Sequence, residues 1–232
     1  MKINMYDWVD SLIAAEKKPP FPVLTFPAIQ KLGITINDLV RSSDNQLKMM
    51  RIIAEETPMP AVAGMMDLSV EAEAFGSTVR FSDNEVPTVI GHIMEEEEDA
   101  DALEIPEIGA GRTQIYIDAI GKAVEAFPDK PVFAGCIGPY SLAGRLLDVN
   151  EVMVLSLEEP DMVHTVLEKV STFLISYMKA YKAVGANGVL MAEPLAGLLG
   201  SGMAQEFSSD YVKKIIDAVQ DENFLVIYHN CG

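Results

Sequence analysis

Apolar positions along the chain fall into two patterns, short uninterrupted runs and longer stretches with a helical period. Short runs that are apolar throughout are typical of strands that are buried on both faces. Such runs occupy residues 21–26, 61–66, 131–137, 188–192 and 224–228. In the stretches between them, apolar residues recur at steps of three and four, as they do on one face of a helix.

The clearest helical stretch covers residues 161–184, and Gly185 directly after it is a typical C-terminal cap. Residues 77–81 are expected to form a hairpin outside the alternation. Further helices are predicted at residues 6–16, 37–55, 112–127, 141–147 and 150–157, and from Ser209 onward. This alternation of apolar strands and helices predicts a parallel sheet covered by helices.

Two architectures fit this order, a doubly wound sheet and a TIM (β/α)8 barrel. No Gly-x-Gly-x-x-Gly follows a predicted strand and no P-loop sequence occurs, so nucleotide-binding versions of the fold lose their support. Polar residues collect where predicted strands end, which is where barrels hold their chemistry. About five strands are predicted against the eight of a closed barrel, so either strands are missed in residues 1–232 or these residues form one incomplete barrel domain of a longer protein.

Composition narrows the class of partner. The chain has 232 residues, of which 49% are hydrophobic, and a net charge of −18. A field of that sign disfavours nucleic acid and anionic membrane surfaces. No secretory signal or membrane span is recognisable, so a reducing cytoplasm is the expected compartment.

The last residues of the chain contain the most specific chemical signal. His229 and Cys231 stand two positions apart at the end of a predicted strand, so their side chains point to the same face. An imidazole and a thiol are both good zinc ligands, and the pair predicts a metal site. A catalytic zinc needs a third protein ligand, for which Glu193, Asp67 and Cys136 are the candidates, although Cys136 is more typical of a small buried residue.

Other strand-end residues are candidates for binding and catalysis. Glu193 and Asp67 each follow an apolar strand, where a carboxylate must be solvated, paired or metal-bound because burying it alone is costly. Each is a candidate contact to substrate or metal, and for Glu193 a helix cap or ion pair is the structural alternative. Tyr140 and Ser141, after Gly138 and Pro139, are expected either to cap a helix or to donate to a substrate.

Four segments resemble the uroporphyrinogen decarboxylase superfamily, and more closely its corrinoid-dependent branch, the methylcobalamin:coenzyme M methyltransferase type. They read MDLSVEAEAFG at residues 66–76, IGPYSLAG at 137–144, GVLMAEPLAG at 188–197 and HNCG at 229–232. The resemblance extends over nearly the whole chain. It implies a TIM barrel with a zinc site at its C-terminal mouth, held by His229, Cys231 and a later cysteine that this chain does not reach. We therefore expect a truncated product, a fragment or a split gene.

Departures from the decarboxylases separate the two branches. Their arginine-rich segment after the first strand corresponds here to residues 24–30, which contain no arginine. Their active-site tyrosine corresponds to Arg145, whereas Asp67 falls at the position of their central aspartate. One matching aspartate without the arginines would hold a substrate with many carboxylates poorly.

The resemblance implies a zinc-dependent methyl transfer from a methyl-corrinoid, presented by a separate carrier protein, to a small thiol or pterin acceptor. Glu193 and Asp67 would orient the reactants, and Tyr140, Ser141 and Arg145 would contact substrate. A metal-free uroporphyrinogen decarboxylase and an inactive corrinoid- or tetrapyrrole-binding module are the alternatives. Because an open barrel exposes strand edges and an apolar interior, we expect self-association into a homo-oligomer, rearrangement of strands, or pairing with the missing portion.

Overall fold

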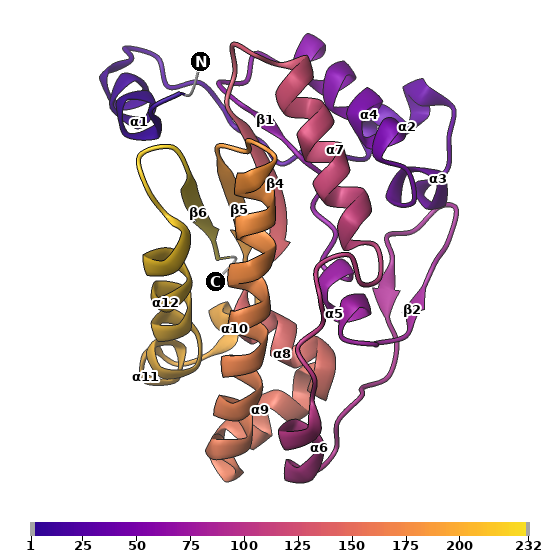
Figure 1. Ribbon diagram of the computed structural model, residues 1–232, viewed down its shortest axis with the longest axis vertical. Coiled ribbons are helices and arrows are strands. Elements are labelled where there is room, and N and C mark those ends of the chain that lie inside the picture. Colours follow the sequence, from indigo (N-terminus) through magenta and orange to yellow (C-terminus); the bar gives the residue numbers. More distant parts are fainter. Residues whose placement is uncertain (1–2, 231–232) are drawn as a thin grey trace.

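The computed structural model describes residues 3–230, and its centre is a four-stranded parallel sheet (Figure 1). The order of the strands is β1-β4-β5-β6, so each later strand is added to the same side of the sheet. Right-handed crossover helices are the usual connection between such strands, and this order is that of a barrel wall. The strands are β1 Val62–Ala63, β4 Val132–Ile137, β5 Gly188–Ala192 and β6 Leu225–His229.

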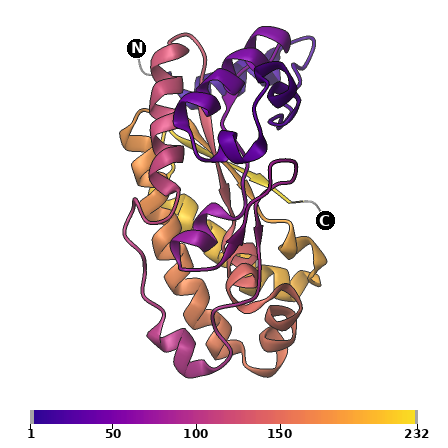
Figure 2. The ribbon, with the colours of Figure 1, turned by 90° about the vertical axis from the view of Figure 1, so that its right-hand side faces the viewer.

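Helices cover one face of this sheet and both of its ends (Figure 1, Figure 2). The longest, α10 (Pro160–Ala183), runs alongside α7 (Thr113–Ala126) and α12 (Asp210–Val219). Below the sheet in Figure 1, where β4 ends, lie α8 (Pro139–Leu147) and α9 (Val149–Glu158). Within residues 3–230 no helix combines the length and the apolar composition that crossing a bilayer requires.

The remaining elements lie mainly in the first half of the chain. Two strands form an antiparallel hairpin, β2 Val79–Arg80 and β3 Thr88–Val89. The other helices are α1 Met5–Ala14, α2 Pro27–Leu32, α3 Ile36–Val40, α4 Ser43–Glu56, α5 Val70–Ala74, α6 Glu97–Ala102 and α11 Ser201–Ala204. A 3₁₀ turn covers Leu195–Leu198, and a π-helical turn, Gln205–Ser209, joins α11 to α12.

The two faces of the sheet are buried by different parts of the chain. Because successive strand residues point to opposite faces, Ala134 and Cys136 of β4 enter the core under the helices, whereas Phe133 faces the other side. There the ring of Phe133 lies 5.6 Å from that of Trp8 on α1 and 5.7 Å from that of Phe21. The N-terminal segment thus covers part of the face that a closed barrel would enclose.

Most of the predicted elements are confirmed, including the later three strands and the long helix. The hairpin expected at residues 77–81 has only its first strand there, because its second strand is Thr88–Val89. The strand expected at residues 21–26 is wrong, since these residues form no strand. Pro22 lies within this segment and prolines 19, 20 and 27 flank it, and a proline lacks the N–H group that a sheet needs. The helix predicted over residues 37–55 is two helices, α3 capped by Thr35 and α4 capped by Ser42.

The close approach of β5 to its neighbours yields a stability prediction. A Cβ on Gly188 would collide with the carbonyl oxygen of Leu225 and lie 2.6 Å from the Phe133 ring. We expect Gly188→Ala to lower the free energy of unfolding by about 1–3 kcal/mol, measured by urea denaturation. Gly121→Ala on α7, whose Cβ would lie 3.5 Å from Val184, is the control. Because alanine favours a helix more than glycine does, this control should leave the free energy of unfolding unchanged or raise it by up to about 1 kcal/mol. Equal losses of stability in both variants would contradict the packing argument.

Candidate active site at the carboxyl ends of the strands

The carboxyl ends of β4, β5 and β6 meet at one level of the sheet. Ile137 is opposite Ala192, and Ala192 is opposite His229. Glu193 therefore comes directly after the central strand of the three, and α8 begins beside it. The sequence prediction that polar residues gather at this edge is confirmed for Tyr140, Glu193 and His229, while Cys231 lies outside the described residues.

Glu193 is fully buried, and its carboxyl group binds the first turn of α8. One oxygen accepts from the backbone N–H of Tyr140 at 3.0 Å and the other from that of Ser141 at 2.6 Å. These are N–H groups that a helix leaves without intrahelical partners. Burial raises the pKa of Glu193 to about 7, although the hydrogen bonds from Ser141 and Tyr140 oppose the shift. The structural alternative considered for Glu193, a helix cap, is thus what the geometry shows.

Gly138 is required for this arrangement, because a Cβ there would lie 2.6 Å from the carboxyl carbon of Glu193. The backbone N–H of Glu193 also donates to the carbonyl oxygen of His229 at 2.9 Å. Glu193 consequently connects the turn after β4 with the end of β6.

Tyr140 and Ser141 are buried and use their side chains within the protein. The Tyr140 hydroxyl lies 3.2 Å from that of Ser156 on α9. The Ser141 hydroxyl accepts from the backbone N–H of Leu195 at 3.1 Å. Both residues therefore hold α8 against its neighbours, and Ser141 also lines a cavity. Contact of either with a substrate stays a prediction.

Asp67 is buried in a network that uses both of its oxygens. One oxygen accepts from the guanidinium of Arg112 at 2.6 Å and from the hydroxyl of Tyr116 at 2.7 Å. The other accepts from the backbone N–H and the hydroxyl of Ser69, at 3.0 and 2.6 Å. Arg112, itself only 3% exposed, also binds Glu73 at 2.6 Å. The carboxylate that the sequence marked as a substrate contact is therefore paired inside the protein.

Sequence reasoning missed Arg112, Glu73 and Tyr116 as partners of Asp67. Arg112 and Tyr116 stand four residues apart at the start of the predicted helix, so they face the same side. That spacing was the available signal, but it does not say which strand end the pair meets. Burial is the first cause that raises the pKa of Tyr116 well above its usual value, and the neighbouring Asp67 adds to it.

A third buried acid, Glu71 on α5, contacts the end of β4. One of its oxygens accepts from the backbone N–H of Ile137 at 3.1 Å, and the other has no hydrogen-bond partner among the described residues. Burial raises the pKa of Glu71 to about 8, so the group is mainly neutral at pH 7.

Cys136 does not join the candidate metal site. Its side chain is buried in the core beneath the helices, and burial raises the pKa of its thiol well above the usual value. His229 aligns with Ile137 across the sheet and so points to the opposite face. Within residues 3–230 no three His, Cys, Asp or Glu side chains are placed to hold a metal ion together.

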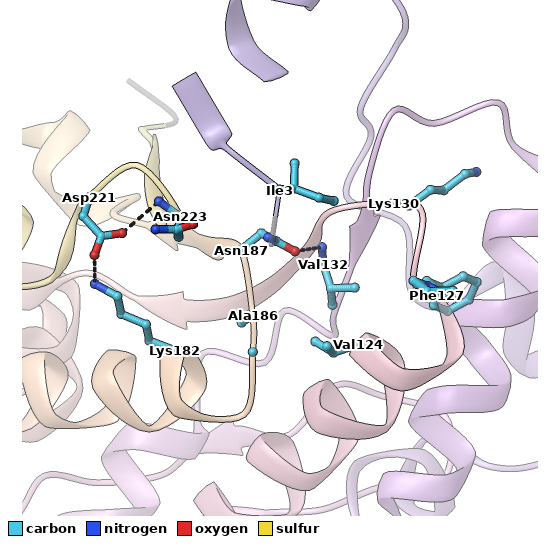
Figure 3. Close-up of a pocket in the computed structure, with 12 residues that line it drawn as sticks. Ile3, Val124, Phe127, Lys130, Val132, Lys182, Ala186, Asn187, Asp221 and Asn223 are labelled. Atoms are coloured by element: carbon cyan, nitrogen blue, oxygen red, sulfur yellow. Dashed lines mark hydrogen bonds and ion pairs between the residues drawn. The ribbon is translucent and has the colours of Figure 1, made fainter. Parts of the chain in front are cut away.

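Two adjoining cavities lie beside these strand ends, with volumes of about 340 and 280 Å³. Leu68 and Arg145 line both of them. A third cavity, of about 280 Å³, lies at the opposite end of the sheet, and Figure 3 shows its lining. There the Asn187 side chain accepts from the backbone N–H of Val132, and Lys182 pairs with Asp221 (Figure 3).

The Asp67 network predicts a large stability effect. We expect Arg112→Met to lower the free energy of unfolding by about 3–5 kcal/mol, because it leaves two carboxylates without their counter-charge in a buried site. Lys213→Met, which removes one partner of an exposed ion pair with Asp217, should cost less than about 1 kcal/mol. Urea unfolding at pH 7 measures both, and a similar small loss in the two variants would refute a structural role for Arg112.

Glu71 predicts how stability depends on pH. A carboxyl whose pKa rises from 4.5 to about 8 on folding favours the folded state when protonated. Its contribution is complete below pH 4.5 and is lost as the pH rises through 8. Glu71→Gln should therefore flatten the decline of unfolding free energy between pH 5.5 and 8, by at most about 1.4 kcal/mol per pH unit. Glu125→Gln, at an exposed position of α7, is the charge-matched control, and an unchanged slope in the Glu71 variant would contradict the assignment.

Comparison with known proteins places this arrangement in a family. A methylcobamide:CoM methyltransferase, MtbA, of Methanosarcina mazei is 32% identical over 180 residues, 74% of this chain and 52% of that protein. Its counterpart from Methanosarcina acetivorans is 30% identical over the same shares. A uroporphyrinogen decarboxylase of Burkholderia pseudomallei is 26% identical, over 73% of this chain and 49% of the relative. The chain thus spans about half the length of the curated relatives it matches.

The fold agrees with the sequence similarity. A solved structure of a methyltransferase from Methanosarcina mazei superposes with a TM-score of 0.87 at 22% identity, covering all of this chain and 71% of that one. This shows that the sheet and its helices are part of a TIM barrel of the uroporphyrinogen decarboxylase type. The uroporphyrinogen decarboxylase (URO-D) family model matches residues 23–232, and the chain belongs to that family.

Proposed function

We propose that this chain carries part of the methyl-transfer site of a corrinoid-dependent methyltransferase. The methyl group would pass from a methyl-corrinoid, presented by a carrier protein, to a small thiol such as coenzyme M, or to a pterin. The observation that carries the proposal is the position of His229. It ends β6 beside the end of β5, in a chain 30–32% identical to methylcobamide:CoM methyltransferases.

The residues of this site suit zinc. His229 is exposed at the strand end, and Cys231 follows two residues later in the sequence. Imidazole nitrogen and thiolate sulfur are the ligands that zinc prefers, and these two residues would hold it. When bound, zinc would lower the pKa of an acceptor thiol and so favour its nucleophilic thiolate form.

The role of Glu193 follows from its contacts. It binds the first turn of α8 and, through its backbone N–H, the carbonyl oxygen of His229. Glu193 thereby sets the distance between the cavities beside α8 and the end of β6. In this proposal it is a positioning residue for His229. Asp67 is likewise a positioning residue, in its case for the loop after β1, which lines one cavity.

Uroporphyrinogen decarboxylation is less well supported. A carboxylate that steadies pyrrole N–H groups needs free acceptor positions, whereas both oxygens of Asp67 already accept two hydrogen bonds each. Residues 24–30 supply no arginine for the acidic side chains of the porphyrinogen. Turnover of uroporphyrinogen without added metal would nevertheless decide in favour of the decarboxylase.

The zinc assignment predicts the behaviour of three variants. Titration with Zn²⁺ at pH 7 should show binding that His229→Ala weakens at least tenfold and Cys231→Ala abolishes. His92→Ala, which removes a histidine from a loop elsewhere, should leave the affinity unchanged. Stoichiometric zinc retained by the Cys231 variant would overturn the assignment.

Methyl transfer itself is measured by the loss of methylcobalamin absorbance in the presence of zinc and 2-mercaptoethanesulfonate. Thiol-dependent loss that requires His229 would support the proposal. Binding of a corrinoid or tetrapyrrole without turnover, with any added metal, would instead indicate an inactive binding module.

A further inference from the structure

Arg145 is a cation beside the strand ends whose charge no described residue compensates. It lies in the last turn of α8 and is partly buried, yet it makes no hydrogen bond or ion pair with any residue from 3 to 230. Arg112, by contrast, binds two carboxylates. A half-buried guanidinium loses part of its hydration, and without a counter-charge this loss is not compensated. A bound anion would accept its hydrogen bonds and neutralise its charge.

The surroundings of Arg145 are apolar. It lines both of the adjoining cavities of about 340 and 280 Å³, and no other Lys or Arg lines either. Their apolar walls are formed by Met65, Met66, Leu68, Val86, Val89, Ile137, Val149, Leu195 and Leu198. Sites for small organic molecules have this character, a mostly apolar lining with a few polar groups that orient the ligand.

The nearby acids do not compete for this guanidinium. Asp67 lines the larger cavity, but both of its oxygens are occupied by Arg112, Tyr116 and Ser69. Glu193 is fully buried against the first turn of α8. Arg145 is therefore the group available to an anionic ligand.

We propose that the two cavities bind a small organic monoanion whose apolar body is longer than two carbons. The guanidinium of Arg145 binds its carboxylate or sulfonate, and Leu68, Ile137 and Leu195 contact its body. A single guanidinium matches one anionic group through paired N–H bonds. A two-carbon chain would leave most of the apolar wall uncovered. The inference rests on the proposed function in one respect, that this ligand is the acceptor of the methyl transfer, and it narrows that acceptor to one longer than coenzyme M.

Binding of linear carboxylates to the 232-residue chain tests the proposal without zinc or corrinoid. In titrations followed by calorimetry or NMR, affinity should rise about fourfold for each methylene from acetate to hexanoate. Hexanoate should bind at least tenfold more tightly than hexanamide, its neutral counterpart. Arg145→Gln should abolish this preference for the anion, and Arg145→Lys should keep part of it.

Lys130→Gln is the matched control, because it removes a cation from the cavity at the other end of the sheet (Figure 3). It should leave hexanoate binding unchanged. Equal affinities for hexanoate and hexanamide, or an Arg145→Gln variant that retains the preference, would overturn the assignment of Arg145. Tighter binding of acetate or of 2-mercaptoethanesulfonate than of hexanoate would overturn the size argument.

The methyl-transfer function and the anion site at Arg145 can be refuted independently of each other. Arg145-dependent binding of hexanoate together with absent methyl transfer would refute the proposed function and leave the anion site. Methyl transfer without an effect of Arg145 on anion binding would refute the anion site alone.

Discussion

The carboxyl group of Glu193 joins three consecutive strand ends. Glu193 directly follows β5. Its carboxyl group accepts hydrogen bonds from the first N–H groups of α8, which follows β4, and its backbone N–H donates to the carbonyl oxygen of the last residue of β6. Burying a carboxyl group is costly, and helix N–H groups without partners are costly as well. Each satisfies the other here, so the site depends on this contact for its geometry.

Two buried polar groups also satisfy each other at the end of β1. Asp67 and Arg112 are both buried, and either would be strongly unfavourable without the other. Their pairing brings the loop after β1, α5 and α7 together. The polar residues that suggest catalysis in the sequence thus largely build the rim of the barrel. Arg145 has no counter-charge among the described residues, and the proposed anion site is based on this.

The inner face of the sheet is covered near the amino ends of the strands and exposed near their carboxyl ends. Near the amino ends of the strands, Trp8 and Phe21 cover Phe133. At the carboxyl ends, His229 of β6 is exposed. Covering the apolar part while leaving the polar end open keeps the candidate site accessible. Self-association through the edges of the sheet stays a prediction.

The sequence by itself determined the alternation of strands and helices, the strand ends as the place of polar chemistry, and the family. These follow from local patterns, namely apolar runs, helical periodicity and short motifs. It misplaced a strand at residues 21–26, where prolines remove the donors, and merged α3 with α4 across the cap at Ser42. Only the tertiary structure decided that Asp67 pairs with Arg112, 45 residues away, and that Glu193 caps α8. The physical reason is that a buried charge finds its partner across the fold, and no local pattern specifies which distant residue that will be.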